Sequence, residues 1–303
     1  MRKYLGIFIL LLILVLTFTF KNQIISLVID NIIISKEVNL EYKNEYYLSY
    51  NFNFVHNVDE FELNNKEDLL NLYYTVLNSG VNSFEFYCPS TYKNCINDVI
   101  DYANNQKELS YINGFVHPFN SFDTIQTTYD SLGKVTLRIV KTYTDLDVVK
   151  IKDKIKEIVD TLDVKDKSDK DKIKIIHDYI INNTKYDKDR TDKNIIKYDS
   201  NTAYGVFFEG YGICSGYSDA MAIFLDYFGI PNFKVTSENH VWNAVYIDNE
   251  WYHLDLTWDD PILDNGKDVL FHNYFLIDTS KLESYNDNQH NFDKKIYSEL
   301  FNK

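Results

Sequence analysis

Cys214, His240 and Asp255 follow one another along a short stretch of the chain, and together they could perform nucleophilic catalysis. A cysteine attacks as a thiolate, and a neighbouring imidazole held by a third polar group can take the thiol proton at neutral pH. Taken alone, a free cysteine is more often a small buried apolar residue. The local sequences around these three residues favour the catalytic interpretation.

A helix is predicted directly after Cys214. Gly229 and Pro231 supply its stop signal, and Cys214 falls in its first turn. The free N–H groups and positive end of a helix favour a thiolate, and they could also stabilise an oxyanion. The apolar residues that recur at helical spacing are Tyr217, Ala220, Met221, Phe224, Leu225 and Phe228.

Three strands are predicted after this helix, at 233–238, 240–247 and 251–257. Asp248 and Asn249 suit a two-residue hairpin turn, because both tolerate positive φ. That turn places Ile247 opposite Glu250.

The same register places His240 opposite Thr257, with Asp255 diagonally adjacent to His240 on the same face. Asp255 stands between two leucines and needs a partner if it is buried. His240 is the preferred partner, and His253, which has the same parity as Asp255, is the competitor. A metal site made by His240, His253 and Asp255 is a weaker alternative, since no close ligand pair opens it.

Four blocks of the sequence are similar to the blocks that characterise the transglutaminase-like superfamily, a branch of the papain-like cysteine enzymes. The resemblance spans roughly Asp145 to Asp278. The blocks are the helix segment Ile176–Asp187, the cysteine block Gly210–Tyr217, the segment Asn239–Asn243 and the segment Trp251–Pro261.

The resemblance implies that Cys214 is the nucleophile, His240 the general base and then acid, and Asp255 the residue that orients the imidazole. It implies acyl transfer from an amide through a thioester, to water or to an amine, without a metal or an organic cofactor. The fold implied is α+β, with the cysteine helix packed on an antiparallel sheet that carries the histidine and the aspartate. Family members complete the oxyanion hole with a side chain upstream of the cysteine. Tyr204 is the candidate for that donor here, although a packed core aromatic is the simpler role for it.

Other polar residues of these blocks have simpler interpretations. His177 is interpreted as a structural hydrogen-bonding residue. The acidic segment after Trp258 lacks the carboxylate spacing of a calcium loop and is interpreted as a polar turn; its residues are Asp259, Asp260, Asp264, Asn265 and Gly266.

Composition sets further bounds on the protein. The chain has 303 residues and a formal net charge of −14, which argues against a nucleic-acid partner. Aromatic residues make up 16% of the sequence, which argues against disorder.

The N-terminus has a charged segment, Met1–Lys3, followed by 17 mostly apolar residues from Tyr4 to Phe20. No small-residue cleavage site comes after it, so we expect an uncleaved, single-pass signal anchor over 1–23, with a cleaved signal peptide as the alternative. Either outcome places the enzyme outside the cytoplasm, attached to the membrane or secreted. In an exported protein Cys88 and Cys95 could form a disulfide, and the alternative is that both remain free thiols.

Two further regions follow the anchor: an α+β region over 24–144 with no assignable role, and the catalytic region over 145–303. Elements predicted before the cysteine are extended structure at 42–55, helices at 69–77, 96–103, 148–162 and 173–180, and strands at 84–87 and 135–139.

Two functions compete on the sequence alone. The first is an extracytoplasmic cysteine peptidase or acyltransferase that acts on proteins or peptides, with cell-wall proteins among the candidates. The second is a surface binding or adhesion module that keeps the fold without the chemistry.

Overall fold

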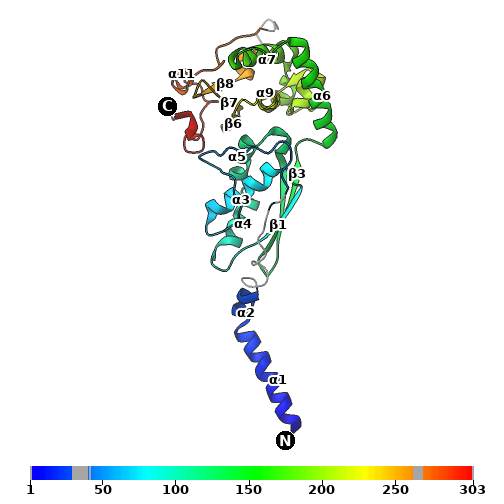
Figure 1. Cartoon of the computed structure of the whole chain (residues 1–303), viewed down its shortest axis with the longest axis vertical. Helices are drawn as coiled ribbons and strands as arrows, with labels where there is room; N and C mark the ends of the chain where they lie inside the picture. Colours follow the sequence, from blue (N-terminus) through cyan, green and yellow to red (C-terminus); the bar gives the residue numbers. More distant parts are fainter. Residues whose placement is uncertain (1, 29–39, 41, 262–268, 302–303) are drawn as a thin grey trace.

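The computed structural model describes residues 2–28, 40, 42–261 and 269–301, and its elements are labelled in Figure 1. Helices α1 (Arg2–Thr19) and α2 (Lys21–Val28) lie apart from the folded body, with many exposed apolar side chains on α1. None of the helices in the described ranges meets the length and hydropathy of a membrane span. The predicted transmembrane anchor is therefore not confirmed.

The middle region combines helices with a three-stranded antiparallel sheet whose strand order is β1-β3-β2 (Figure 1). Asn65 caps the longest of these helices by accepting the backbone N–H groups of Glu67 and Asp68. Gly80 ends that helix with a φ of 77°, in the left-handed region that favours glycine. The elements are α3 (Lys66–Ser79), β1 (Ser83–Tyr87), α4 (Cys95–Asn104), α5 (Lys107–Phe115), η2 (Pro118–Asn120), β2 (Phe122–Tyr129) and β3 (Lys134–Lys141).

The C-terminal region places helices around a second antiparallel sheet, of order β6-β7-β8. Helix α9 packs against β6 and β7, and α7 packs against α9. The elements before the sheet are α6 (Asp145–Leu162), α7 (Asp169–Asn183), β4 (Lys185–Tyr186), α8 (Lys188–Lys193), η3 (Gly205–Glu209), β5 (Tyr211–Gly212) and α9 (Cys214–Tyr227). The strands of the sheet are β6 (Asn232–Thr236), β7 (Val241–Ile247) and β8 (Glu250–Leu254), and the helices after it are α10 (Leu256–Asp259), α11 (Thr279–Ser284) and η4 (Ser298–Phe301).

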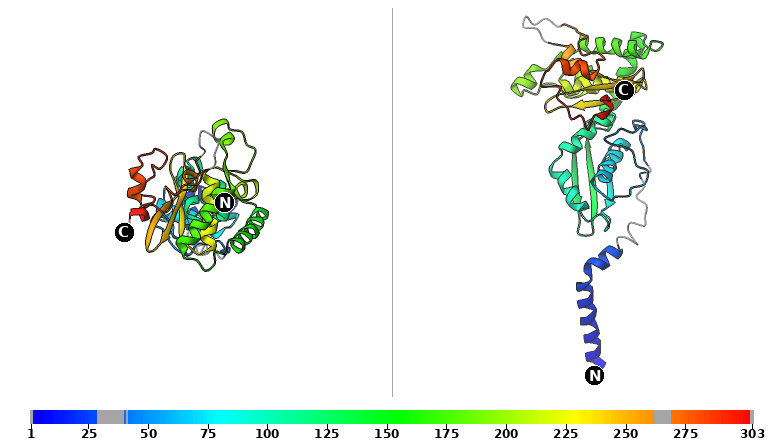
Figure 2. Two further views of the ribbon diagram at one scale, coloured as in Figure 1. Left: turned by 90° about the horizontal axis from the view of Figure 1, so that it is seen from above. Right: turned by 90° about the vertical axis from the view of Figure 1, so that its left-hand side faces the viewer.

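The two regions lie end to end in Figures 1 and 2, but one hydrophobic core crosses between them. Phe115 of α5 stacks on Phe233 of β6 at 5.2 Å and on Tyr297 at 5.6 Å. Gly114 lies so close to β6 that a Cβ atom there would stand 2.4 Å from the carbonyl oxygen of Lys234. The middle region thus forms part of the support for the sheet that carries the site.

Most of the predicted elements are confirmed, namely the helices α3, α4, α6, α7 and α9 and the strands β1, β3, β6, β7 and β8. The extended structure predicted at 42–55 is wrong, because this segment forms turns and irregular chain and none of the assigned strands. Its polar backbone groups bond to side chains instead, as when Leu48 N–H donates to Asn78 Oδ1 at 3.0 Å. Residues 262–268, which include Asp264, Asn265 and Gly266 of the predicted polar turn, lie outside the described residues.

Cys88 and Cys95 form a disulfide, which decides between the two alternatives left open by the sequence. The bond closes the short loop between β1 and α4. Cys214 is therefore the one free cysteine among the three in the chain.

Candidate active site

Cys214 is the first residue of α9, as predicted, and it is half-buried. The residue before it, Ile213, is extended and provides no side-chain cap for the helix. The N–H groups of the first turn are therefore not satisfied by a capping side chain, and they lie beside the sulfur. The positive end of the helix favours negative charge at this position.

Close backbone contacts fix the first turn of α9. A Cβ atom on Gly216 would stand 2.3 Å from the carbonyl oxygen of Ser200, so only glycine allows this approach. Ile213 N–H donates to the same oxygen at 2.8 Å. The Ser200 hydroxyl donates to Asp187 Oδ2 at 2.7 Å, and Asp187 N–H donates to the Gly212 carbonyl at 2.9 Å. These contacts tie the cysteine loop to the segment that precedes it.

The hairpin that carries the histidine has the predicted turn. Asp248 and Asn249 have φ values of 52° and 67°, and Ile247 pairs with Glu250. His240 stands immediately before β7. Asn243 of β7 donates a hydrogen bond of 3.0 Å to the carbonyl of Ser218, which locks the strand to α9.

His240 connects the cysteine to the aspartate. Its Nε2 lies 2.6 Å from Asp255 Oδ2, and the Cys214 side chain is close enough to interact electrostatically with the ring. Since Asp255 occupies Nε2, Nδ1 is the ring nitrogen left for the sulfur. Burial by itself lowers the pKa of His240, but Asp255 and Cys214 outweigh burial and raise this pKa to about 10. The ring is therefore charged at neutral pH and suits a thiolate–imidazolium pair.

The strand predicted at 251–257 ends early, at Leu254, because Asp255 caps helix α10. Asp255 Oδ1 accepts the backbone N–H groups of Thr257 at 2.9 Å and Trp258 at 3.2 Å. The expected pairing of His240 with Thr257 is therefore wrong, although the hairpin register is right as far as Leu254 opposite Asn243. His240 and Asp255 still meet, because the cap holds Oδ2 toward the ring.

A second histidine contacts the same carboxylate, and no sequence pattern marks it. His290 Nε2 lies 2.9 Å from Asp255 Oδ2, and its Nδ1 lies 2.8 Å from Asp287 Oδ1. The His290 ring stacks on Tyr274 at 5.0 Å. Burial alone would raise the pKa of Asp255, but His240 and His290 hold it well below its ordinary range. Asp255 is therefore ionised throughout the physiological range.

Tyr186 is the second residue that sequence reasoning missed, although it lies within a recognised block. Burial raises the pKa of Tyr186, and the charge of Cys214 raises it further, so the phenol lies within electrostatic range of the thiol. Tyr204, the oxyanion donor considered from the sequence, lies elsewhere: Lys150 donates to its hydroxyl at 3.4 Å, and its ring packs on Phe208 at 4.7 Å. Of these two upstream tyrosines, Tyr186 is the one with an electrostatic interaction with Cys214.

His253 does not compete for Asp255. Trp242 Nε1 donates to His253 Nδ1 at 2.9 Å, and His253 Nε2 lies 3.1 Å from the Thr279 hydroxyl. Burial lowers the pKa of His253 to about 3, so it is a neutral core residue. This overturns the metal site built on His240, His253 and Asp255.

Two other groups of side chains in the described ranges are close enough to share an ion. One is His240, Asp255 and His290, and the other is His177, Asp178 and His272. In both groups the histidine nitrogens stand at hydrogen-bond distances from a carboxylate, 2.6–2.9 Å in the first and 2.7–2.9 Å in the second. Hydrogen bonding alone accounts for these contacts. His177 also lies 3.2 Å from Asp259 Oδ2, which agrees with a structural role.

Comparison with known proteins identifies the region that holds the site. Residues 156–256 match the transglutaminase-like superfamily, about a third of the chain. Cys214, His240 and Asp255 all fall within the match, whereas His290 lies beyond it. No curated protein sequence matches the chain.

Three solved structures share limited similarity with the chain. A protein described as a TGase is 18% identical, with a TM-score of 0.34, and the match covers 45% of this chain and 44% of that one. A putative cysteine protease from Cytophaga hutchinsonii is 16% identical, with a TM-score of 0.29 and coverage of 48% and 65%. A putative protease from Parabacteroides distasonis is 13% identical, with a TM-score of 0.23 and coverage of 49% and 40%. The chain thus spans less than two thirds of the length of each.

Proposed function

Because residues 156–256 belong to the transglutaminase-like superfamily, we propose that this chain is a cysteine-dependent enzyme that transfers acyl groups from amide bonds of proteins or peptides. The observation that carries the proposal is the alignment of Cys214, His240 and Asp255, in which His240 hydrogen-bonds with Asp255 and interacts electrostatically with Cys214. A buried Asp–His pair beside a half-buried thiol at a helix N-terminus is the arrangement that activates a cysteine.

The reaction follows from the positions of these groups. The Cys214 thiolate attacks the amide carbonyl carbon, and a tetrahedral oxyanion forms. The C–N bond then breaks as His240 donates its Nδ1 proton to the leaving nitrogen, which leaves a thioester on Cys214. His240 next takes a proton from water or from an amine, which attacks the thioester and releases the acyl group with Cys214 again a thiolate.

The oxyanion has two sources of stabilisation. One is the set of uncapped N–H groups in the first turn of α9, and the other is the hydroxyl of Tyr186, which lies on β4 paired with Gly212 of the cysteine loop and within electrostatic range of Cys214. Removal of a single oxyanion donor commonly costs about 10²–10³ in rate. Tyr186 thus takes the role that was considered for Tyr204.

We also propose that the enzyme works outside the cytoplasm, held at the membrane by the apolar segment within 1–23 or secreted if that segment is cleaved. The disulfide between Cys88 and Cys95 supports this location, because such bonds persist in oxidising compartments. Fractionation of cells that express the full chain tests the proposal. Recovery of the enzyme with its cysteines reduced in the cytosolic fraction would contradict it.

The direct test of activity offers casein as acyl donor with either a fluorescent primary amine or water as acceptor. We expect either fluorescence on casein or release of ammonia and peptides, and the acceptor used distinguishes transamidation from hydrolysis. Cys214→Ala should abolish both. Tyr204→Phe is the matched control for Tyr186→Phe, and it should retain nearly full activity, since Tyr204 contacts Lys150 and Phe208. Activity that survives in Cys214→Ala would overturn the proposal.

A further inference from the structure

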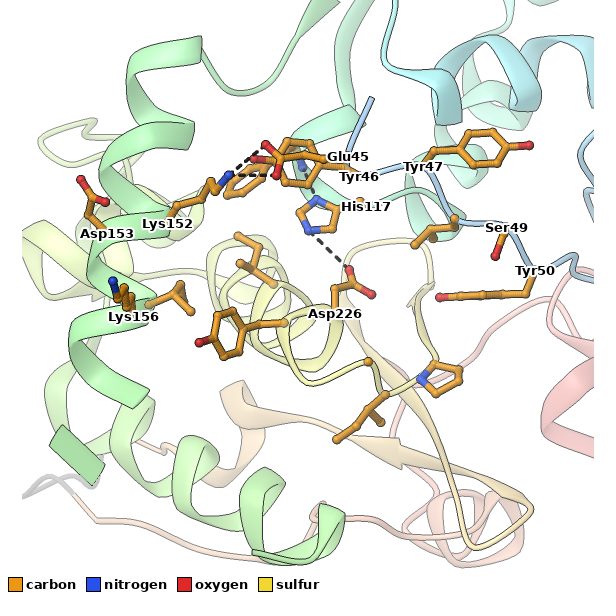
Figure 3. A pocket seen from close by; sticks show the side chains of 18 residues that line it. Glu45, Tyr46, Tyr47, Ser49, Tyr50, His117, Lys152, Asp153, Lys156 and Asp226 are labelled. Carbon is orange, nitrogen blue, oxygen red and sulfur yellow. Dashed lines mark hydrogen bonds and ion pairs between the residues drawn. The ribbon is translucent and has the colours of Figure 1, made fainter. Parts of the chain in front are cut away.

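The end of α9 opposite Cys214 borders a cavity of about 600 Å³, shown in Figure 3. Its walls come from the segment Glu45–Tyr50, from η2 and α6, from the last turn of α9, and from Gly229–Pro231. A helix of 14 residues is about 20 Å long, so this cavity is separate from the active site. Its volume lies within the range of small-molecule sites.

A half-buried carboxyl group with incomplete hydrogen bonding, that of Asp226, lies in this cavity. Asp226 Oδ1 accepts a hydrogen bond of 2.9 Å from Asn232 Nδ2. Oδ2 lies 3.6 Å from His117 Nε2, which is beyond hydrogen-bond distance. His117 Nδ1 accepts the backbone N–H of Phe119 at 3.0 Å, so the ring proton resides on Nε2 and points toward Asp226 (Figure 3).

The charges around Asp226 leave this end of the cavity negative. Asp226 lies in the last turn of α9, where the helix dipole is also negative and no basic side chain compensates it. Lys152 is occupied by Glu45 at 2.9 and 3.0 Å (Figure 3). The charge of Lys234 lowers the pKa of Asp226 slightly, but Lys234 forms its ion pair with Asp219. Burial raises the pKa of Asp226 to about 7, because the charged form of the carboxyl group has no cation beside it to offset the loss of water.

Apart from Glu45 and the charged side chains of α6, the rest of the lining is largely apolar and aromatic. Aromatic faces attract cations as well as apolar groups. Figure 3 shows Tyr50 extending toward the same space as Asp226. The other apolar and aromatic lining residues include Tyr46, Phe119, Ile155, Ile223, Tyr227 and Ile230.

We propose that this cavity binds an organic ammonium ligand with an apolar body, whose charged nitrogen contacts Asp226 Oδ2. The ammonium group supplies the hydrogen bond and the positive charge that Asp226 lacks. The apolar body fills the space between η2, α6 and the last turn of α9. The site does not depend on the chemistry proposed for Cys214.

Isothermal titration of the full chain with n-hexylammonium chloride tests the proposal, with 1-hexanol and sodium hexanoate as probes of equal length. We expect the ammonium to bind at least about tenfold more tightly than either probe, because only the ammonium pairs with Asp226. At about pH 7 its binding should release protons, seen as a dependence of the heat on the buffer. Equal binding of the ammonium and the alcohol, or no binding of the ammonium, overturns the proposal without the need for any variant.

Two matched variants locate the ammonium group. Asp226→Asn keeps an oxygen for Asn232 and should weaken hexylammonium binding about tenfold or more. Asp153→Asn makes the same change on an exposed part of the lining and should alter binding less than about twofold. Alkylation of Cys214 should remain normal in both, which shows that the variants are folded and keeps this test separate from that of the proposed enzyme. Equal effects of the two substitutions would contradict the role of Asp226.

Discussion

Helix α9 has a carboxylate near each of its ends, one buried and one half-buried, and the two differ in their partners. Asp255, near the N-terminal end, contacts His240 and His290 and accepts two backbone N–H groups. Asp226, at the C-terminal end, has Asn232 and a histidine beyond hydrogen-bond distance. The pKa of the first lies well below its ordinary range, whereas that of the second rises to about 7.

Burial raises the pKa of any carboxyl group, so the difference comes from what surrounds each one. Near Cys214 two imidazole rings and the N-terminus of α10 supply positive charge and donors. At the other end of α9 the helix dipole adds negative charge, and Lys152 and Lys234 are paired elsewhere. The protein itself therefore supplies the partners that keep Asp255 charged, whereas Asp226 gains a matching positive charge only from the ligand that we propose.

The largest expected effect comes from Asp255→Asn. It removes the charge that keeps the His240 ring protonated and oriented, so we expect acyl transfer to fall about 10²–10⁴-fold. Initial rates on casein measure the loss. The same substitution at Asp226 is the matched comparison and should change the rate less than about twofold, because it lies about 20 Å away along α9. Similar losses of rate in both variants would contradict the assignment of Asp255, and not Asp226, to the catalytic site.

Tyr186→Phe should have the next largest effect. Loss of one oxyanion donor should lower acyl transfer about 10²–10³-fold, while alkylation of Cys214 by iodoacetamide should hardly change, because alkylation forms no oxyanion. The ratio of the two rates is the measurement. Equal loss in both reactions would mean that Tyr186 acts on the thiol and not on the carbonyl oxygen.

Asp226→Asn should stabilise the protein above neutral pH. The pKa of Asp226 is about 7 in the folded chain, against an ordinary value of 3.8 that applies to the unfolded chain. Between these two pH values the folded protein holds a proton that the unfolded chain has lost, so the folded state loses stability as the pH rises. We expect a gain of about 4 kcal/mol in the free energy of unfolding at pH 8, since each pKa unit corresponds to about 1.4 kcal/mol, and almost none at about pH 4. Urea denaturation at the two pH values measures it, and a gain that does not depend on pH would contradict the raised pKa.

The smallest expected effect is that of His290→Phe, which removes one of the two partners that distinguish Asp255 from Asp226. His240 remains, so acyl transfer should fall only about tenfold, which is about 1.4 kcal/mol. His290→Gln, which can still donate to Asp255, should recover most of the rate and of its pH profile. Without rescue by glutamine, the contribution of His290 would be packing against Tyr274 and not the hydrogen bond.

Local sequence patterns predicted the position of Cys214 and the hairpin. Apolar spacing marks α9 over its whole length, and Asp248 with Asn249 specifies the turn that sets the register. The end of β8 was missed because Asp255 can either continue a strand or cap a helix, and tertiary contacts decide which. The irregular segment 42–55 was missed because its many aromatic residues pack individually against the core instead of pairing in a strand.

Features that depend on distant parts of the chain could not be predicted. His290 meets Asp255 across 35 positions of sequence, and no periodic pattern marks it. The cavity beside Asp226 joins His117 to the last turn of α9, so it exists only once the middle region and the C-terminal region are packed together. The catalytic residues lie in short sequence motifs close together in the chain, whereas the residues that line this cavity form no sequence motif.

The most direct test of the central claim is the pH dependence of the reaction of Cys214 with iodoacetamide, since the other two cysteines are bonded to each other. A thiolate held by His240 and Asp255 should react at about pH 5.5 within about threefold of its rate at about pH 8. Cys214→Ala gives the background. A rate that climbs about tenfold with each pH unit toward about 8.5 is the behaviour of an ordinary thiol, and it would favour a binding module over an enzyme.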